Sequence, residues 1–287
     1  MLDCSLYLYA SDQAALGGHS AGGSGFLVHI PSSVNPAMGH VYGVTNRHVL
    51  DKGFHVVRLN RVGGGFETIV TRREEWTPHP TGLDVEVRPF DVKDRYRWNS
   101  ISSSKFVNSE IMSVFNIGIG DDAFAVGRLV NHEGTQRNAP IVRFGAIALV
   151  ADPDEPILTE TGLQEAFLVE FRSLSGFSGS PVFLTTTQFY DGEAAQQVTA
   201  YRQREMGFVP PTDGPKISTV SISGTHGPWL LGIDCGHIPL WSTVRERDSI
   251  SKMIDRDRDT NLRVEVNTGV AIVLPAWISW RCSTMSS

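Results

Sequence analysis

Short runs of hydrophobic and polar residues recur along most of the chain. The runs are rich in β-branched and aromatic residues and are bounded by Gly, Pro, Asn or Asp, a pattern typical of strands in a sandwich or barrel. The pattern therefore predicts an all-β protein. The predicted strands are SLYLYA, SGFLVHIP, HVYGVTN, FHVVRLNR, FETIVTRR, DVEVRPF, DDAFAVGRLV, PIVRFGAIALV, AFLVEFR, SPVFLTT, WLLGIDCG and TGVAIVLP.

Helical periodicity is found in two places, residues 243–258 and the terminal PAWISWRC, where Pro275 suits a first helical turn. Two segments interrupt the strand pattern: residues 185–226, which are polar and rich in Thr, Gln, Ser and Gly, and the charged run 243–260. We expect both segments to be insertions on the surface of the core unit.

The length and composition suit one large β unit or two smaller domains, because 287 residues at 41% hydrophobic can bury a full core. The polar stretch 91–110 is placed to join two halves. We predict a single unit over residues 1–287, with a first half over about 1–110 and a second half over about 111–287.

Charge and cysteine content limit the partners and the compartment expected for this protein. The net charge is −6, and the 25 Lys and Arg residues are spread along the chain, so no basic stripe indicates nucleic acid as a partner. Three scattered cysteines form no disulfide framework and favour a reducing compartment. The first residues lack the features of a secretory signal, and no run approaches the roughly 18 apolar residues of a membrane span. We expect a cytoplasmic protein with no membrane partner.

The segment LSGFSGSPVF, residues 174–183, crowds serines and glycines between hydrophobic residues. A serine hydroxyl becomes a nucleophile only when a base takes its proton, and an acid usually orients that base. TNRHVL places His48 after a predicted strand, and LDVEVRPF places Asp84 at the start of another. Asp91 and Asp94 lie nearby and are alternatives for the acid.

These motifs resemble those of the chymotrypsin-fold (trypsin-like) serine peptidases. TNRHVL is similar to the family's histidine motif, LDVEVRPF to its aspartate strand, and GFSGSP to its Gly-x-Ser-Gly-Gly-Pro motif, with Ser178 as the nucleophile and Ser180 in place of the last glycine. LLGIDCGH, NTGVAIVLPAWISW, GGSGFLVHIP and VRFGAIALV resemble further strands, so the resemblance covers nearly the whole chain. The free cysteines resemble the intracellular bacterial and phage-type branch.

The resemblance implies a fold of two six-stranded antiparallel β-barrels with a short C-terminal helix, here with two polar surface insertions. It implies that His48 is the general base toward Ser178 and that Asp84 orients His48. The backbone N–H groups of Gly176 and Ser178 would form the oxyanion hole. Substrate would lie along the strand after the nucleophile. In this chain the strand residues that would contact substrate are Asp234, Cys235, Gly236 and His237.

Arg172 lies six residues before Ser178, where the trypsin subgroup has an acid at the base of its specificity pocket. A preference for basic substrates is therefore not expected. Arg172 either lines the pocket, where it would favour an acidic substrate side chain, or points from its strand to solvent.

Other sites are weaker candidates. The run 255–266 begins like a calcium loop but has Thr260 where the turn requires Gly and Val266 where a bidentate Glu should close the site. No histidine or cysteine spacing indicates a metal site, and no glycine-rich segment has the pattern of a phosphate loop, so no metal or cofactor is expected.

Two other functions are weaker alternatives. An α/β-hydrolase would need Gly at position 180 and helices alternating with the strands, although Asp234 with His237 or His226 supplies the right order of acid and histidine. A peptidase fold that is latent or serves as a peptide-binding module would have its cleft covered by the insertion 185–226. We expect a serine endopeptidase that acts on a polypeptide substrate; no regulatory partner is identified.

Overall fold

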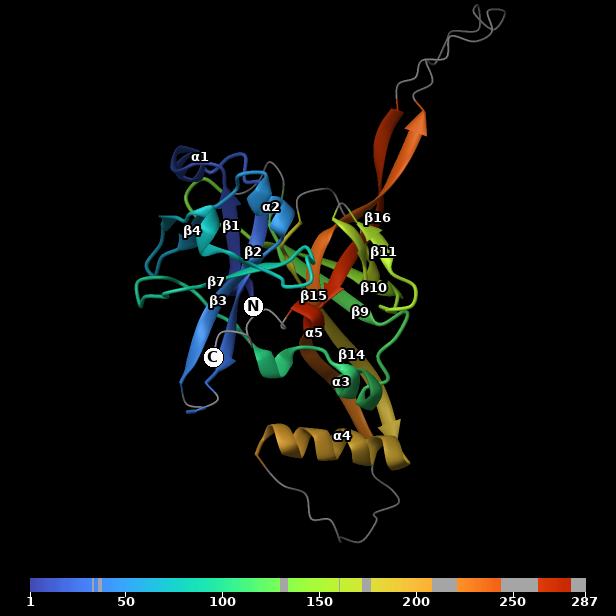
Figure 1. Cartoon of the computed structure of the whole chain (residues 1–287). Coiled ribbons are helices and arrows are strands. Elements are labelled where there is room, and N and C mark those ends of the chain that lie inside the picture. The colour runs from blue at the N-terminus through green and yellow to red at the C-terminus, as the bar shows by residue number, and fades with distance from the viewer. Residues whose placement is uncertain are drawn as a thin grey trace, which may run out of the picture.

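The computed structural model describes residues 1–32, 34–35, 38–129, 134–159, 161–171, 177–207, 221–243 and 263–279 (Figure 1). Its main parts are a first β-sheet, a closed β-barrel beside it, and helices at the edges of both. The protein is therefore mainly β, as the strand pattern predicts.

The first sheet has eight strands and is built from the N-terminal part of the chain. Neighbouring strands on its main path are antiparallel, while the two-residue β8 pairs with β2 in parallel. The path runs through β5 (Phe66–Val70), β4 (Val56–Asn60), β1 (Ser5–Tyr9), β2 (Gly23–Pro31), β3 (Gly39–Thr45), β7 (Glu86–Pro89) and β6 (Thr77–Pro78), with β8 (Ile101–Ser102) to the side.

The second half forms a closed barrel of six antiparallel strands. In order around the barrel these are β10 (Ile141–Leu149), β13 (Phe167–Phe171), β16 (Arg263–Pro275), β15 (Ser221–Thr243), β14 (Pro181–Asp191) and β9 (Asp122–Gly127). A separate hairpin pairs β11 (Ile157–Thr159) with β12 (Gly162–Gln164).

Apart from α4, the helices are short and lie at the ends of strands. The α-helices are α1 (Asp12–Gly17), α2 (Arg47–Asp51), α3 (Ser109–Val114), α4 (Gly192–Glu205) and α5 (Ala276–Ser279); the 3-10 turns are η1 (Leu2–Cys4), η2 (Arg73–Glu75) and η3 (Ser103–Lys105). No helix among the described residues is both long enough and apolar enough to cross a membrane.

Each predicted strand segment contains an observed strand, and the predicted C-terminal helix is α5, which begins just after Pro275. The six-stranded barrel of the second half agrees with the prediction. In the first half, the predicted six-stranded barrel is instead an eight-stranded sheet that does not close among the described residues. The two additional strands, β6 and β8, have two residues each, too few to leave an alternating pattern. The predicted helix 243–258 lies outside the described residues, except for residue 243.

The insertion 185–226 differs most from its prediction as a polar surface excursion. Its first residues extend β14, and a 14-residue helix, α4, follows. Only Ala195, Val198 and Tyr201 are buried among the 14 residues of that helix, at a spacing of three residues. Because this apolar stripe is narrow and set among polar residues, helical periodicity is not evident in the sequence.

One hydrophobic cluster joins the two halves. Phe26, Val28 and Val44 of the first sheet pack in the same buried cluster as Phe124 and Leu230 of the barrel. The two halves are therefore in direct apolar contact, and residues at the rim of this interface hold fixed positions relative to each other.

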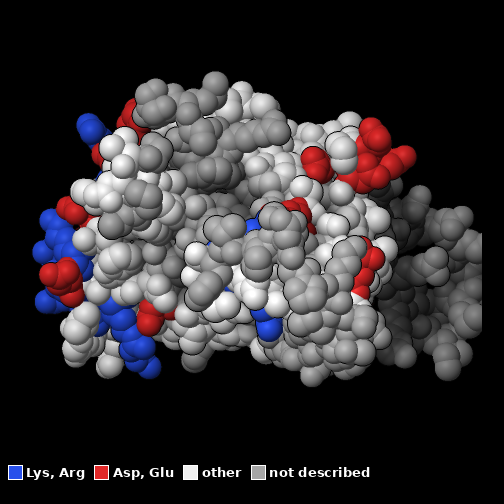
Figure 2. Space-filling model, turned by 90° about the horizontal axis from the view of Figure 1, so that it is seen from below, with Lys and Arg blue, Asp and Glu red and all other residues white. Residues whose placement is uncertain are grey.

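Charged side chains on the surface are mixed in sign. Figure 2 views the end of the molecule where α4 lies, and on the left of this view, over the first sheet, basic side chains sit beside acidic ones. Ion pairs on this half include Arg95 with Glu67 at 2.6 Å and Arg88 with Glu75 at 2.8 Å. These pairs neutralise much of the basic charge locally.

Candidate active site

The predicted base, His48, lies in the short helix α2, directly after β3. β3 ends at Thr45, whose hydroxyl donates a hydrogen bond to the Ser24 carbonyl at 2.7 Å. Asn46 keeps an extended backbone at the N-cap, and both Thr45 and Asn46 are fully buried. The chain after β3 thus forms a short helix, and the buried residues at its start fix the position of the imidazole.

Asp84 lies in the loop before β7 and contacts His48 twice. Its Oδ2 is 2.7 Å from His48 Nδ1, and its Oδ1 accepts a hydrogen bond from the His48 backbone N–H at 2.9 Å. Asp84 is 2% exposed. A carboxylate at Nδ1 requires the proton on that nitrogen, which leaves Nε2 as the basic atom.

The two alternative acids lie elsewhere in the structure. Asp91 is exposed and pairs with Lys93 at 3.4 Å. Asp94 is exposed, and no described contact joins it to His48. Asp84 is therefore the one of the three carboxylates that the fold brings to the imidazole.

Ser178 lies in a tight turn before β14, and three backbone hydrogen bonds attach this turn to neighbouring strands. The Ser24 N–H donates to the Ser178 carbonyl at 2.8 Å, and the Gly179 N–H donates to the Asp234 carbonyl at 2.8 Å. The Asp234 N–H donates in turn to the Ser180 carbonyl at 3.0 Å. The turn is thereby attached to β2 of the first sheet and to β15 of the barrel.

Gly179 is required in this turn by its conformation and by its surroundings. Its φ is +85°, in the left-handed region that favours glycine. A Cβ at this position would lie 1.9 Å from the Ser24 carbonyl oxygen. The glycine after Ser178 therefore allows the turn to approach β2 closely.

The start of β2 lies between the Ser178 turn and α2. A Cβ built on Gly23 would lie 2.7 Å from the Val49 side chain and 3.3 Å from the Ser178 carbonyl oxygen. Because Val49 follows His48 in α2, the Ser178 turn and α2 border the same short stretch of β2. Among the described residues, no hydrogen bond joins Ser178 Oγ to His48. Such bonds are often long in an empty site and tighten with substrate.

Gly176, the other predicted donor of the oxyanion hole, and Arg172 lie in residues 172–176, outside the described part of the chain. The predictions for these two residues therefore stay predictions.

The predicted substrate strand, Asp234 to His237, contains a bulge. Asp234 pairs with Val273 and His237 with Ala271, so β15 has one more residue than β16 between these pairs. Gly236 has a φ of +122° at the bulge, and its N–H donates to Asp234 Oδ1 at 2.7 Å. The bulge turns the backbone at Cys235 and Gly236 out of regular pairing with β16.

The Asp234 carboxyl is buried at the edge of the site. It is 3% exposed, and burial raises its pKa from 3.8 to about 7, although the Gly236 N–H and the charge of His48 act in the opposite direction. A second carboxyl, one that changes charge near neutral pH, therefore lies within electrostatic range of His48.

Asn46 and Cys235 form a contact that the sequence did not predict. Asn46 Nδ2 donates to the Asp84 carbonyl at 2.8 Å and lies 3.4 Å from Cys235 Sγ. Burial, followed by the charges of Asp84 and Asp234, raises the pKa of the Cys235 thiol well above its usual range. Cys235 is thus a protonated polar group that faces the acid side of the site, and its thiol is a poor nucleophile.

Asn46 is the residue that sequence reasoning missed. The available signal was an amide directly before a short helix, where Asn commonly caps with its side chain. Here the side chain makes no cap hydrogen bond and is turned to Asp84 instead. Asn46 therefore supports the backbone of the acid.

Among the residues described, no group of three or more His, Cys, Asp or Glu side chains is placed to hold a metal ion. Asp255, Asp257 and Asp259, which begin the weak calcium-loop pattern, lie outside those residues.

Comparison with known proteins gives a distant likeness. No family model and no curated protein matches the sequence. Among solved structures, the chain is similar to the MamO protease domain from Magnetospirillum magneticum in its apo form. The identity is 13%, the match covers 96% of this chain and 93% of that chain, and the TM-score is 0.49. A likeness this distant carries no functional argument.

Proposed function

We propose that the protein is a serine endopeptidase that cuts peptide bonds through an acyl-enzyme on Ser178. The observation that carries the proposal is the double contact between His48 and Asp84, made beside the turn that holds Ser178. A buried carboxylate on Nδ1 of a partly exposed imidazole is the arrangement that a serine nucleophile requires.

The chemistry assigns one role to each group. His48 Nε2 takes the proton of Ser178 Oγ as this oxygen attacks the substrate carbonyl, and the Asp84 carboxylate stabilises the imidazolium that forms. His48 then gives the proton to the leaving amine, and water, activated by the same imidazole, hydrolyses the ester. Under the same proposal, the backbone N–H groups of Gly176 and Ser178 stabilise the oxyanion.

An extended substrate has a strand edge available in this arrangement. β14 pairs with β15 as far as Pro181 opposite Ile233, and the Ser178 turn continues this pairing to Asp234. Beyond Asp234, at Cys235 and Gly236, the described pairing on that side of β15 stops. A peptide can add there as a further strand, with its scissile bond near Ser178.

The alternative function is a peptide-binding module whose cleft is closed by the insertion. The described part of the insertion that forms α4 lies beside α3, at the opposite end of the barrel from α2 (Figure 1). Arg204 of α4 pairs with Glu110 of α3 at 2.6 Å. This placement favours an open site over a covered one, with residues 208–220 outside the described part of the chain.

A turnover assay with denatured casein tests the proposal. Ser178→Ala should lower the rate at least ~10³-fold, since loss of a triad member removes nucleophilic catalysis. Ser104→Ala, at an exposed serine in η3, is the matched control and should keep the wild-type rate. Full activity in Ser178→Ala would refute the assignment. Absence of turnover in a wild-type protein that still binds the peptide would instead favour the binding module.

A further inference from the structure

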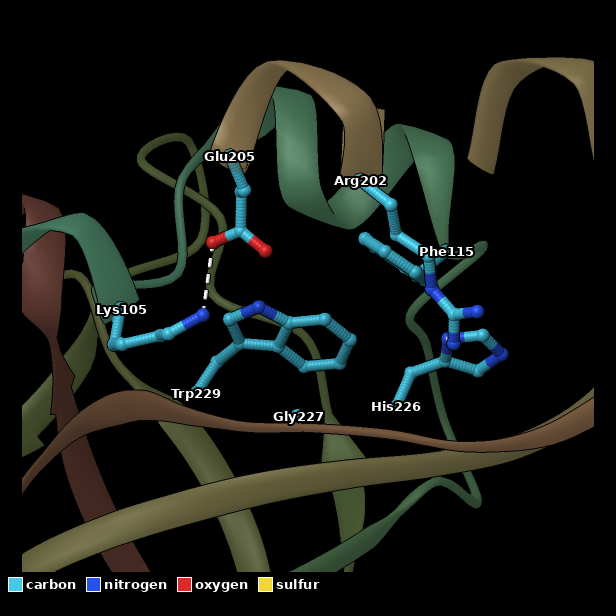
Figure 3. A pocket seen from close by; sticks show the side chains of 7 residues that line it. All are labelled: Lys105, Phe115, Arg202, Glu205, His226, Gly227 and Trp229. Carbon is cyan, nitrogen blue, oxygen red and sulfur yellow. Dashed lines mark hydrogen bonds and ion pairs between the residues drawn. The ribbon is translucent and has the colours of Figure 1, made fainter. Parts of the chain in front are cut away.

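A pocket of about 150 Å³ lies beneath α4, between that helix and β15 (Figure 3). It lies away from the Ser178 turn, because β15 reaches the pocket at His226 and Trp229 and reaches the turn only at Asp234. The mechanism proposed above makes no use of this pocket.

Arg202 brings an unbalanced positive charge to the pocket. Its guanidinium lies 2.6 Å from His226 Nδ1 and points at that ring in Figure 3. Because arginine can only donate, His226 Nδ1 must be the acceptor and the imidazole is neutral. Burial and the charge of Arg202 both lower the pKa of His226, which agrees with a neutral ring.

The other charged groups of the lining cancel each other. Lys105 Nζ lies 2.8 Å from Glu205 Oε1. Among the residues that the structure describes, Arg202 pairs with no carboxylate. Of its five N–H donors, one makes a described hydrogen bond, to His226. The described lining therefore has one net positive charge, with donors available.

Trp229 contributes an indole N–H donor at the wall of the pocket. The residue is 3% exposed, and Figure 3 shows its indole nitrogen turned toward the space between Lys105 and Glu205. In the described part of the chain, no acceptor receives a hydrogen bond from this N–H. The ring is buried, but its nitrogen remains accessible from the pocket, so an acceptor on a ligand can reach this donor.

The two donors lie at different ends of one aromatic wall. The ring centroids of Phe115 and Trp229 are 4.4 Å apart, and those of Phe115 and His226 are 5.2 Å apart. Arg202 stands at the His226 end and the indole N–H at the Lys105 end (Figure 3). A complementary occupant is small, has a flat part, and carries an anion at one end and a neutral acceptor at the other.

We propose that this pocket binds a small carboxylate that also carries a carbonyl acceptor, the chemistry of an N-acylated amino acid. The carboxylate pairs with the guanidinium of Arg202, whose planar donors match its two oxygens. The acyl carbonyl accepts the indole N–H of Trp229.

Titration of the full-length protein with N-acetylglycine, followed by ligand-observed NMR, tests this proposal. N-acetylglycinamide has the same shape without the charge and should bind at least ~10-fold more weakly, since charged hydrogen bonds of this type contribute that much. Inorganic phosphate lacks the carbonyl and should also bind more weakly. Equal binding of the acid and the amide, or stronger binding of phosphate, would overturn the proposal.

Variants locate the binding. Arg202→Gln should weaken N-acetylglycine binding at least ~10-fold, and Trp229→Phe, which keeps the aromatic wall, should weaken it about 3- to 10-fold. Arg204→Gln is the matched control, because Arg204 is on the same helix and pairs with Glu110 outside the pocket. Unchanged affinity in Arg202→Gln would refute the assignment. The readout is binding, so its outcome is independent of the peptidase proposal.

Discussion

Asp234 is a carboxyl whose charge the fold suppresses. Burial raises its pKa to about 7. The native state therefore keeps a proton between about pH 4 and pH 7 that the unfolded chain has already released, so this group lowers stability as pH rises through that range. Below pH 4 both states are protonated, and above pH 7 both are ionised, so its contribution is constant there.

Asp234→Asn should remove this pH dependence, because the amide oxygen can still accept the Gly236 N–H without ionising. Relative to the variant, the wild type should lose about 2–3 kcal/mol of unfolding free energy between pH 5 and pH 7. Urea denaturation at both pH values measures the difference. Parallel pH profiles for the two proteins would show that Asp234 is ionised at pH 5 in the native state.

The positions of the site residues were predictable from the sequence where a motif marks them. His48 and Asp84 lie together as their order in the chain predicts, and Ser178 borders the same stretch of β2. The contact of Asn46 with Asp84 and Cys235 was not predictable, since it joins residues far apart in sequence. Burial of Asp234 likewise depends on the packing of strands rather than on its neighbours in the chain.

At the scale of elements, the Ser178 turn depends on its close approach to β2. Gly179 and Gly63 both have a φ of +85°, but a Cβ on Gly179 would lie 1.9 Å from the Ser24 carbonyl oxygen, whereas a Cβ on Gly63 would have nothing within 4 Å. Substituting each of these two glycines therefore distinguishes the cost of backbone strain from the cost of a steric clash.

Gly63→Ala should cost about 1 kcal/mol of unfolding free energy, the usual penalty for a side chain at positive φ, and Gly179→Ala should cost clearly more. Urea denaturation of both variants checks this. Equal losses would mean that the turn can move away from β2 without cost.

Elements with regular alternation were predicted well, while short helices were not. Each predicted strand segment contains an observed strand. In the barrel, inward-facing hydrophobic residues of β9, β10, β13, β14, β15 and β16 pack in one buried cluster. α2 and α3 have five and six residues, so they span fewer than two turns and leave no periodic pattern. α4 is longer, but it buries only a narrow stripe against the barrel.

At the scale of the whole molecule, a buried arginine joins the two halves. Arg58 of β4 is fully buried, and its Nε donates to Asn138 Oδ1 at 2.6 Å. Asn138 Nδ2 donates back to the Arg58 carbonyl at 2.7 Å, and the Asn60 amide bonds the Asn138 backbone at both its N–H and its carbonyl. The segment before β10 is thereby attached to the first sheet.

Asn138→Ala should cost about 2–4 kcal/mol of unfolding free energy, because it leaves a buried guanidinium without one of its acceptors. Asn99→Ala, at an exposed asparagine, is the control and should change stability by less than about 0.5 kcal/mol. Thermal or urea unfolding measures both. A loss in Asn138→Ala no larger than that of the control would show that this contact does not join the halves.

The proposed activation of Ser178 by both halves of the molecule is tested most directly by covalent labelling. Incubation of the native protein with a fluorophosphonate, followed by intact-mass measurement and peptide mapping, should show one phosphonyl group on Ser178. Heat-denatured protein and Ser178→Ala should show none, since the reaction requires a serine activated by His48. Absence of label on Ser178 in the native protein, or an equal label after denaturation, would contradict the account.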